Sequence, residues 1–431
     1  MQFQKNEIIE FNKRKVKIID FLGSGGQGEV YLVNDGSKDY AFKYYFDVPS
    51  SDFKYNLRNN IAKGSPSDRF LWPKEFIEFS DETCGYFMDL RPKNFVSFVS
   101  YLNGVKKFKD TKTMIKWCLE LCLAFKKLHE RGYSYQDLND GSFFFDPDTG
   151  NLLICDNDNV TADQKNLGVL GKMRYMAPEI VRGEKLPDTH SDRFSLAVIL
   201  FLTLCLGNPF EGKRLKNYDF VDETSEMEMF GTKPLFIMHK TNTDNRPIQG
   251  YHTAVIKRWP HLPIYIKEAF HRTFVDGLID RENERVTEIE WIKYLCKYRD
   301  ELLTCSCGNE YIYGFEETRL NEVCPICHKQ TKRFCYLSVG KHSIALEPNK
   351  SIYEFHLDKY SSNYNTEIAK VIVNKNNPGI WGIKLNVKES VEICDLSGLR
   401  KIIAPNGVIP IVNNLKIDFN ELTMAKINMS K

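Results

Sequence analysis

The chain has 431 residues, of which 42% are hydrophobic and 27% charged, and this composition predicts two or three globular domains and excludes a disordered chain. The formal net charge of +2 is too close to neutral to indicate a nucleic-acid partner. The longest apolar run, Phe194 to Leu206, is too short to span a bilayer, and the first residues lack the apolar core of a signal peptide. We therefore expect a cytoplasmic protein without nucleic-acid or membrane partners.

The first predicted elements are β-strands between Val16 and Ala41, interrupted by a glycine-rich loop. The loop reads G-S-G-G-Q-G-E-V and places Gly23, Gly25, Gly28 and Val30 in the pattern G-x-G-x-x-G-x-V. Glycines let backbone N–H groups approach phosphate oxygens without a Cβ in the way. Strands on both sides argue against the strand-to-helix turn of a dinucleotide site, although glycine-rich hairpin turns without a ligand are also common.

A lysine follows the loop, at the end of the sequence Y-A-F-K that closes with Lys43. A strand lysine is usually a solvated edge residue, but its place after the loop makes Lys43 a candidate for contacting the α- and β-phosphates of a nucleotide. The spacing of apolar residues predicts a helix over Phe53 to Lys63. Tyr86 to Met88 predicts a buried strand, which is followed by Asp89 and Leu90.

A long helix and a hairpin come next. Thr111 to Arg131 carries an amphipathic pattern, and Gly132 is its stop signal. Phe143 to Phe145 and Leu152 to Ile154 predict two strands joined by the turn D-P-D-T-G.

Two aspartates, Asp137 and Asp156, each close a short apolar run on either side of this hairpin. The hairpin would place both carboxylates together at the same end. Such a pair suits phosphoryl transfer, in which one carboxylate accepts the proton of the attacking hydroxyl and the other holds magnesium against the phosphates. An acidic hairpin that only faces solvent is the alternative for this stretch taken alone.

The motifs, in this order, resemble the protein kinase family. Asp137 lies in Y-Q-D-L-N-D-G-S, where the family has H-R-D-L-x-x-x-N, and Asp156 opens D-N-D, where the family has D-F-G. An A-P-E match ends at Glu179, and the region around Arg285 resembles the one that supplies its partner. The resemblance covers about residues 12–300.

The resemblance implies an α+β, bilobal kinase domain over residues 1–300, with an N-lobe at about 12–91 and a C-lobe at about 92–300. It implies that ATP and Mg²⁺ are used to phosphorylate a protein substrate. The implied nucleotide-binding residues lie on the glycine loop and nearby strands: Gly23, Gly25, Gly28, Val30, Ala41, Lys43, Met88, Asp89 and Leu90.

The catalytic roles implied by the resemblance fall on few residues. Asp137 would be the base, and Lys43 would position the phosphates. Asp156 and Ser142 would hold magnesium, to which Asp158 could add an oxygen.

Departures from the family concentrate around the γ-phosphate. Asn139 replaces the lysine that normally touches it, Ser142 replaces the magnesium-binding asparagine, and Asp158 replaces the glycine after the metal ligand. The helix at Phe53 to Lys63 has no glutamate to pair with Lys43, where Arg58, Asn59 or Asn60 stands instead. Lys43 is then fixed by an amide, by an acid from elsewhere, or not at all.

Further expectations concern the segment after the hairpin. Thr161 is the only serine or threonine between Asp156 and Glu179, so we expect no activation-loop phosphoswitch of the usual kind. Glu179 is expected to form a structural ion pair with Arg285. Asp192 resembles the aspartate that ties the catalytic loop from below, and a helix N-cap is its simpler interpretation. Between 211 and 261 we expect an irregular, substrate-side loop region.

Four cysteines at 301–332 form the knuckles C-S-C-G and C-P-I-C. Four thiolates from two tight turns predict a structural zinc ribbon, held by Cys305, Cys307, Cys324 and Cys327. Redox-active pairs or buried thiols are the alternatives, and His328 is a spare ligand candidate.

From 333 to 431 the pattern predicts a small β-sandwich. The expected strands are Phe334–Val339, His342–Leu346, Ile352–Leu357, Ile368–Val373, Gly379–Leu385, Val391–Cys394, Lys401–Ile403 and Lys416–Phe419. The later strands, with Val408 to Pro410 between them, resemble the second half of a forkhead-associated domain, but the G-R and S-x-x-H of its phosphothreonine site are absent. A docking or structural module is therefore expected.

The whole arrangement resembles the bacterial kinase of the tellurium-resistance-associated triad. That resemblance implies serine/threonine phosphorylation in a stress or defence pathway, with a metal-dependent phosphatase and a von Willebrand A domain protein as partners. A pseudokinase scaffold that binds nucleotide and docks partners is the alternative, favoured by the missing glutamate and lysine.

Overall fold

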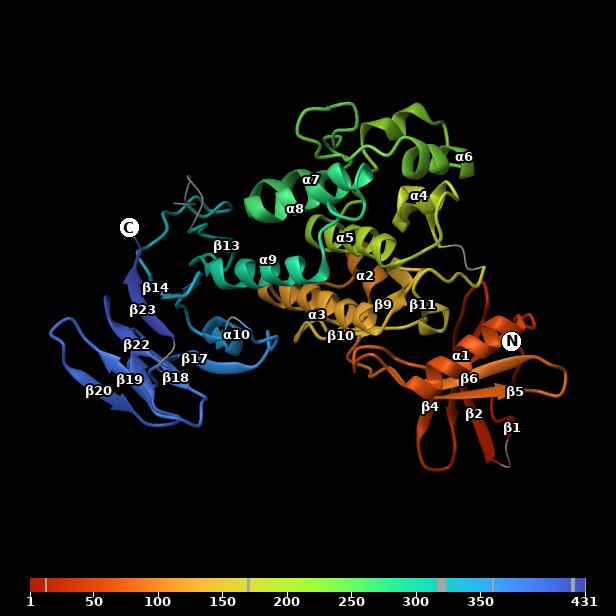
Figure 1. Cartoon of the computed structure of the whole chain (residues 1–431), viewed down its shortest axis with the longest axis horizontal. Coiled ribbons are helices and arrows are strands. Elements are labelled where there is room, and N and C mark those ends of the chain that lie inside the picture. The colour runs from red at the N-terminus through yellow and green to blue at the C-terminus, as the bar shows by residue number, and fades with distance from the viewer. Residues whose placement is uncertain (12–13, 169–170, 316–322, 359, 420–422, 431) are drawn as a thin grey trace. The chain divides into compact units, whose positions relative to one another are not determined.

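The computed structural model describes residues 1–11, 14–168, 171–315, 323–358, 360–419 and 423–430. Its contacts divide the chain into two compact units (Figure 1). The first comprises Met1–Pro260 and Lys267–Ile292, and the second comprises His261–Ile266 and Lys293–Lys431. The division falls inside helices α8 (Ile264–Phe274) and α9 (Glu288–Glu301).

The first unit begins with a six-stranded antiparallel sheet in the order β1-β2-β3-β4-β6-β5. Its strands are β1 (Ile8–Phe11), β2 (Arg14–Ser24), β3 (Gly28–Asn34), β4 (Asp39–Tyr45), β5 (Glu75–Glu78) and β6 (Cys84–Asp89). Helix α1 (Ser51–Lys63) lies against the sheet (Figure 1), and Ser50 caps it by accepting a hydrogen bond from the backbone N–H of Phe53 at 3.2 Å. Because β1 pairs with β2, the sheet starts before residue 12, where the sequence placed its edge.

Helices make up most of the rest of this unit. They are α2 (Phe98–Leu102), α3 (Thr111–Glu130), α4 (Pro178–Val181), α5 (Thr189–Cys205), α6 (Glu223–Glu226), α7 (Thr253–Arg258), α8 (Ile264–Phe274) and the start of α9. Helix α5 is buried on every side from Phe194 onward, because its residues there are nearly all apolar. The region at 211–261, expected to be irregular, contains α6, a π-helical turn at Met227–Thr232 and α7.

Short strands frame the loops between the helices. The predicted hairpin is confirmed, since β9 (Phe143–Phe145) and β10 (Leu152–Ile154) pair antiparallel, and β7 (Val96–Ser97) joins β9. Its turn requires glycine at Gly150, which has a φ of +69° and where a Cβ would collide with the backbone of α3. Strands β8 (Tyr133–Ser134) and β11 (Thr161–Ala162) also pair.

The second unit starts with the hairpin of β12 (Leu302–Thr304) and β13 (Glu310–Ile312) and continues with two larger sheets. Those sheets, in the orders β15-β14-β23-β22-β19-β20 and β16-β17-β18-β21, share one apolar core, to which Leu337 of one sheet and Ile383 of the other contribute. The strands are β14 (Cys335–Val339), β15 (His342–Ala345), β16 (Ser351–Tyr353), β17 (Glu367–Val373), β18 (Trp381–Leu385), β19 (Val391–Cys394), β20 (Arg400–Ile403), β21 (Val408–Pro410), β22 (Lys416–Asp418) and β23 (Met424–Met429).

One strand expected here is wrong over most of its length. Ile352 to Leu357 was expected to be a strand, but the chain turns after Tyr353 into the helical turn α10 (Glu354–Leu357). The turn forms because the Nδ1 atom of His356 accepts a hydrogen bond from the backbone N–H of Tyr353 at 3.0 Å. Phe355 and His356 are both buried, which breaks the alternation of a strand.

Candidate active site

The catalytic loop runs from β8 into a 3₁₀ turn at Asp140–Ser142 and carries Asp137. Asn139 caps that turn, and its Nδ2 atom donates a hydrogen bond to Asp137 Oδ1 at 2.9 Å. Burial raises the pKa of Asp137, and the negative charge of Asp156 adds to the rise, whereas the bond from Asn139 opposes it. Asn139, at the position of the missing lysine, therefore orients the candidate base.

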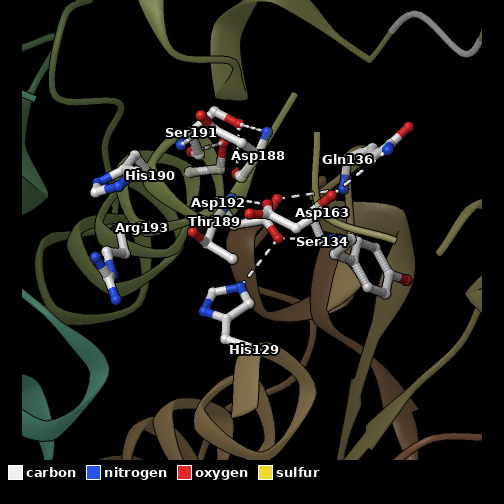
Figure 2. A network of polar contacts seen from close by, with 12 residues as sticks. His129, Ser134, Gln136, Asp163, Asp188, Thr189, His190, Ser191, Asp192 and Arg193 are labelled. Atoms are coloured by element: carbon white, nitrogen blue, oxygen red, sulfur yellow. Dashed lines mark hydrogen bonds and ion pairs between the residues drawn. The ribbon is translucent and has the colours of Figure 1, made fainter. Parts of the chain in front are cut away.

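Asp192 of α5 holds the catalytic loop from below (Figure 2). Its Oδ2 atom accepts a hydrogen bond from the backbone N–H of Tyr135 at 2.6 Å, and its Oδ1 atom accepts one from Gln136 N at 3.2 Å. The simpler interpretation, that Asp192 caps the helix, is wrong because Asp188 is the N-cap of α5 and accepts a hydrogen bond from the N–H of Ser191 at 2.9 Å. The expected tie to the catalytic loop is present.

A buried histidine, which the sequence did not single out, completes this support. His129 lies between Asp192, at 3.1 Å from its Nε2 atom, and Glu288, at 2.9 Å from its Nδ1 atom. Although burial lowers it, hydrogen bonds to the two carboxylates raise the pKa of His129 to about 9. Arg193 contacts Glu288 at 2.9 Å as well. The network therefore carries two cations and two anions at neutral pH.

The activation segment starts in contact with the catalytic loop. Gln136 has a φ of 72°, and its side-chain amide donates to Thr161 and to the backbone carbonyl of Lys165. The hydroxyl of Thr161 donates to the same carbonyl at 2.9 Å, and Thr161 is completely buried. The one serine or threonine between Asp156 and Glu179 is thus engaged in an internal contact.

The D-N-D motif at residues 156–158, here called the metal motif, supplies the partner of Lys43. Lys43 Nζ lies 2.8 Å from Asp158 Oδ2 and 3.5 Å from Asp156 Oδ1. The hydroxyl of Tyr45 donates to the same Asp158 oxygen. Burial lowers the pKa of Lys43, but the carboxylates of Asp158 and Asp156 raise it by more, so the net shift is upward. Of the possibilities that the sequence left open, the structure has an acid from outside α1.

Oxygen atoms suited to magnesium lie beside this contact. Ser142 is buried, and its hydroxyl has no hydrogen-bond partner among the described residues. The backbone N–H of Cys155 donates to the carbonyl of Ser142 at 2.8 Å, which places Ser142 next to the strand end that carries Asp156. The side chain of Asp156 is half exposed. A carboxylate open to solvent and an unpaired buried hydroxyl fit a hard cation, although the aspartates are not among the compact metal-ligating clusters of the described residues.

The apolar residues of the implied nucleotide site share one cluster with a residue of the hairpin. Ala41 and Met88 are buried together with Leu153 of β10, and Val30 and Leu90 pack against them. The sequence did not indicate Leu153 as a member of this cluster because all three residues of its strand are apolar. The carboxylate of Asp89 contacts Lys38 and Lys74, at 3.0 and 2.6 Å, so only its backbone remains for a ligand.

The glycine loop is a tight turn between β2 and β3. The N–H of Gly25 donates to the carbonyl of Gly28 at 2.9 Å, and a Cβ at Gly28 would collide with the backbone of Tyr44. Space around Gly23 and Gly25 is open, which leaves room for a phosphate group.

A second lysine approaches the carboxylates from the activation segment. A Cβ added to Gly171 would lie 3.3 Å from Asp137 Oδ1, so the segment passes directly over the candidate base. Lys172 Nζ lies 3.1 Å from Asp140 Oδ1, and its charge lowers the pKa of both Asp137 and Asp156.

The expected Glu179–Arg285 ion pair is confirmed. Arg285 NH1 and NH2 lie 2.7 and 2.8 Å from the two carboxylate oxygens of Glu179, and Arg285 is 1% exposed. Its Nε atom donates to the carbonyl of Gly277 at 3.1 Å. This bidentate pair fixes the end of the activation segment to the unit.

In the second unit the four cysteines come together, and a metal ion could bind there. The sulfur atoms of Cys305, Cys307, Cys324 and Cys327 all lie within 4.8 Å of one another. Each knuckle is closed by the backbone, as in the hydrogen bond from Gly308 N to the carbonyl of Cys305 at 2.8 Å. The backbone N–H of Cys307 and the neighbouring thiols lower the pKa of Cys305 to about 6, which favours the thiolate that metals bind.

A glycine hairpin, a buried lysine on the following strand and two aspartates beneath them place the first unit in the protein-kinase-like class. The sequence profile of the protein kinase domain matches residues 16–287, and the chain therefore belongs to that family. No helix within the described ranges has the length and apolar character needed to cross a membrane.

Curated relatives are similar to this chain at low identity. They include the serine/threonine-protein kinase AtPK1/AtPK6 of Arabidopsis thaliana (33% identical over 212 residues, 46% of this chain and 44% of the relative). Others are sck2 of Schizosaccharomyces pombe (26% over 209 residues, 44% and 31%) and SCH9 of Saccharomyces cerevisiae (25% over 218 residues, 46% and 25%). The chain covers less than half the length of these relatives.

Proposed function

We propose that this chain is an active serine/threonine protein kinase, which transfers the γ-phosphoryl group of Mg-ATP to a protein hydroxyl. The observation that carries the proposal is the contact of Lys43 with Asp158 at 2.8 Å, because a phosphate-binding lysine needs a carboxylate to hold it. The sequence departs from the family at the usual source of that carboxylate, and Asp158 supplies one from another position. The relatives named as serine/threonine kinases support the choice of acceptor.

The nucleotide would be held by its phosphates. Backbone N–H groups around Gly25 and the ammonium of Lys43 supply positive charge to the phosphate oxygens. Asp156 and Ser142 would hold magnesium, which when bound neutralises charge on the phosphates and orients them. Asp158 is occupied by Lys43, so we assign the metal to the first two residues.

Asp137 would take the proton of the acceptor hydroxyl. Its raised pKa makes it a stronger base than an exposed carboxylate, and Asn139 fixes its Oδ1 atom so that the other oxygen faces the acceptor. The positive charge normally supplied from the position of Asn139 would come from Lys172, whose ammonium acts on both Asp137 and Asp156.

A pseudokinase scaffold is the second candidate. The amide of Asn139 on the base and the serine at the metal position favour it, since both weaken the chemistry around the γ-phosphate. The two candidates are separated by phosphorylation of a generic protein acceptor with labelled ATP.

The decisive variant is Asp137→Asn, with Asp148→Asn in the hairpin turn as its matched control. Asp148 is exposed and lies in the turn that joins β9 and β10, so the same chemical change there should leave activity intact. The kinase proposal expects label transfer by the wild type and by the control, with a loss of at least about 100-fold in Asp137→Asn. Equal transfer by Asp137→Asn would show that the labelling does not use this site.

For the second unit we infer a structural zinc ribbon on the four cysteines, followed by a forkhead-associated-like docking module. The cysteine donor set has no evident open position, which suits a structural role. The two sheets share one core, which supports a β-sandwich. The docking role rests on the sequence. The stress or defence pathway, with a phosphatase and a von Willebrand A domain protein as partners, rests on the sequence resemblance.

A further inference from the structure

The origin of the carboxylate that holds Lys43 is the most unusual feature of the site. Helix α1 packs beside the sheet but offers no acid there, since Asp52 in its first turn is its only acidic residue. The polar side chains that α1 directs at the metal motif are amides. Asn56 and Asn60 donate hydrogen bonds to the carbonyl of Val160 at 2.8 and 2.7 Å.

Asp158 occupies a position from which it can hold the lysine permanently. Its side chain is completely buried, and Oδ2 accepts hydrogen bonds from both Lys43 and Tyr45. Lys43 and Tyr45 are two residues apart on β4 and therefore point to the same face of the sheet. A fully buried carboxylate requires charged and hydrogen-bonded partners, and these two residues provide them.

The turn that carries Asp158 is itself fixed. Asp158 lies in a 3₁₀ turn at Asn157–Asn159, and the amide of Asn157 donates to the carbonyls of Leu71 and Ile154 at 3.0 and 2.9 Å. The turn is thus bonded to both the hairpin and the segment before β5. Because the amides of α1 bond to the residue that ends this turn, the frame that places Asp158 includes α1.

We propose that Asp158, supported by Tyr45, is the positioning residue for Lys43, in place of an acid on α1. This inference rests on the proposed kinase function. The carboxylate that holds Lys43 thus comes from the turn after β10, and the amides of α1 fasten the helix to the end of that turn.

The rival role for Asp158 is magnesium ligation, which its Oδ1 atom permits, since that oxygen has no hydrogen-bond partner among the described residues. The two roles differ in their dependence on the metal. A positioning residue acts through Lys43, whose contact with phosphate exists with or without magnesium. A metal ligand matters only when magnesium is present.

The test is calorimetric titration of the full chain with AMP-PNP, a nonhydrolysable ATP analogue, in magnesium-containing and magnesium-free buffer. The variants are Asp158→Asn and Tyr45→Phe, with Asp52→Asn on α1 as the matched control. We expect Asp158→Asn to weaken binding about tenfold in both buffers, as for the loss of one charge-assisted contact. Tyr45→Phe should weaken it less, and Asp52→Asn should match the wild type.

Catalysis gives an independent readout. A misplaced Lys43 should lower phosphoryl transfer in Asp158→Asn about 100-fold, more than it lowers affinity. Asp158→Asn cannot be used if it loses its thermal unfolding transition. In that case the AMP-PNP affinity of Tyr45→Phe in the two buffers decides between the two roles of Asp158, because that variant keeps both charges.

Several outcomes would overturn the inference. Weakening by Asp158→Asn only with magnesium would make Asp158 a metal ligand, and wild-type affinity in both buffers would leave it a packing residue. Weaker AMP-PNP binding by Asp52→Asn would assign the positioning of Lys43 to α1 instead. Absence of AMP-PNP binding by the wild type would refute the proposed function itself, and the inference with it.

Discussion

The buried His129 makes a measurable contribution to stability that depends on pH. The substitution His129→Gln removes the cation that lies between Asp192 and Glu288 while leaving both carboxylates in place. Arg193 still contacts Glu288, so one ion pair of the network survives.

The size of the effect follows from the pKa of His129, which rises from the ordinary 6.5 to about 9 in the folded chain. A rise of between two and three units corresponds to about 3 kcal/mol of stability. Because the folded state holds the proton more tightly than the unfolded state, this stabilisation is fully present below about pH 6.5. It is lost as the pH rises through 9.

Urea unfolding followed by tryptophan fluorescence measures this difference. Four of the five tryptophans belong to the first unit, Trp72, Trp117, Trp259 and Trp291, so the signal reports mainly on that unit. At each pH, the stability difference is the free energy of unfolding of the wild type minus that of His129→Gln. This difference should fall by about 3 kcal/mol between pH 6 and pH 9.5.

The matched control is His239→Gln, since His239 lies in the same unit and forms no ion pair among the residues that the structure describes. It shows how much of any pH dependence follows from replacing a histidine of this unit that has no such ion pair. A flat difference for His129→Gln, or one that grows with pH, would refute the assignment of a charged imidazole to this network.

Three further predictions concern the ion pair, the second lysine and the cysteines. Glu179→Gln should destabilise the first unit by about 3 to 5 kcal/mol in the same urea assay, because Arg285 would remain as an uncompensated buried charge. Lys172→Met should lower kcat for phosphoryl transfer about 100-fold and leave AMP-PNP affinity nearly unchanged. Zinc analysis of the purified chain should find a single ion bound per chain, released by a chelator with loss of structure in the second unit, and Cys307→Ser should bind it more weakly.

Each of these predictions has a contrary result. Unchanged urea stability of Glu179→Gln would mean that the charge of Glu179 does not stabilise the fold and that the carbonyls of Gly277 and His190 suffice to hold Arg285. A Lys172→Met variant with full kcat would leave Lys172 without a role at the γ-phosphate. A metal-free chain with an intact second unit would make the cysteines reduced thiols.

Features set by local patterns or by motif order could be predicted from the sequence. The β9–β10 hairpin follows from two apolar runs around a turn, and α3 follows from its stripe and its glycine stop. The Glu179–Arg285 pair followed from the order of family motifs, although 106 residues separate its members. In these cases the signal lay in spacing.

Features that depend on which side chains meet in space could not be predicted from the sequence. Asp158 contacts a lysine 115 residues away, and nothing near Asp158 in the sequence marks it as a partner of Lys43 rather than of magnesium. The ion network of His129 joins three helices, so its charge could not be inferred from the helix that carries it. Strand β23 was not predicted, although its buried residues alternate with Lys426 and Asn428 as in a strand with one exposed face.

Intact mass spectrometry shows whether this kinase site transfers phosphate. The purified chain would be incubated with Mg²⁺ and ATP, beside Asp156→Ala and with a generic protein acceptor in the same tubes. We predict phosphate added to the wild type or its acceptor and none with Asp156→Ala. Addition to neither in the wild-type tube, while AMP-PNP still binds, would contradict the kinase proposal and identify a nucleotide-binding scaffold.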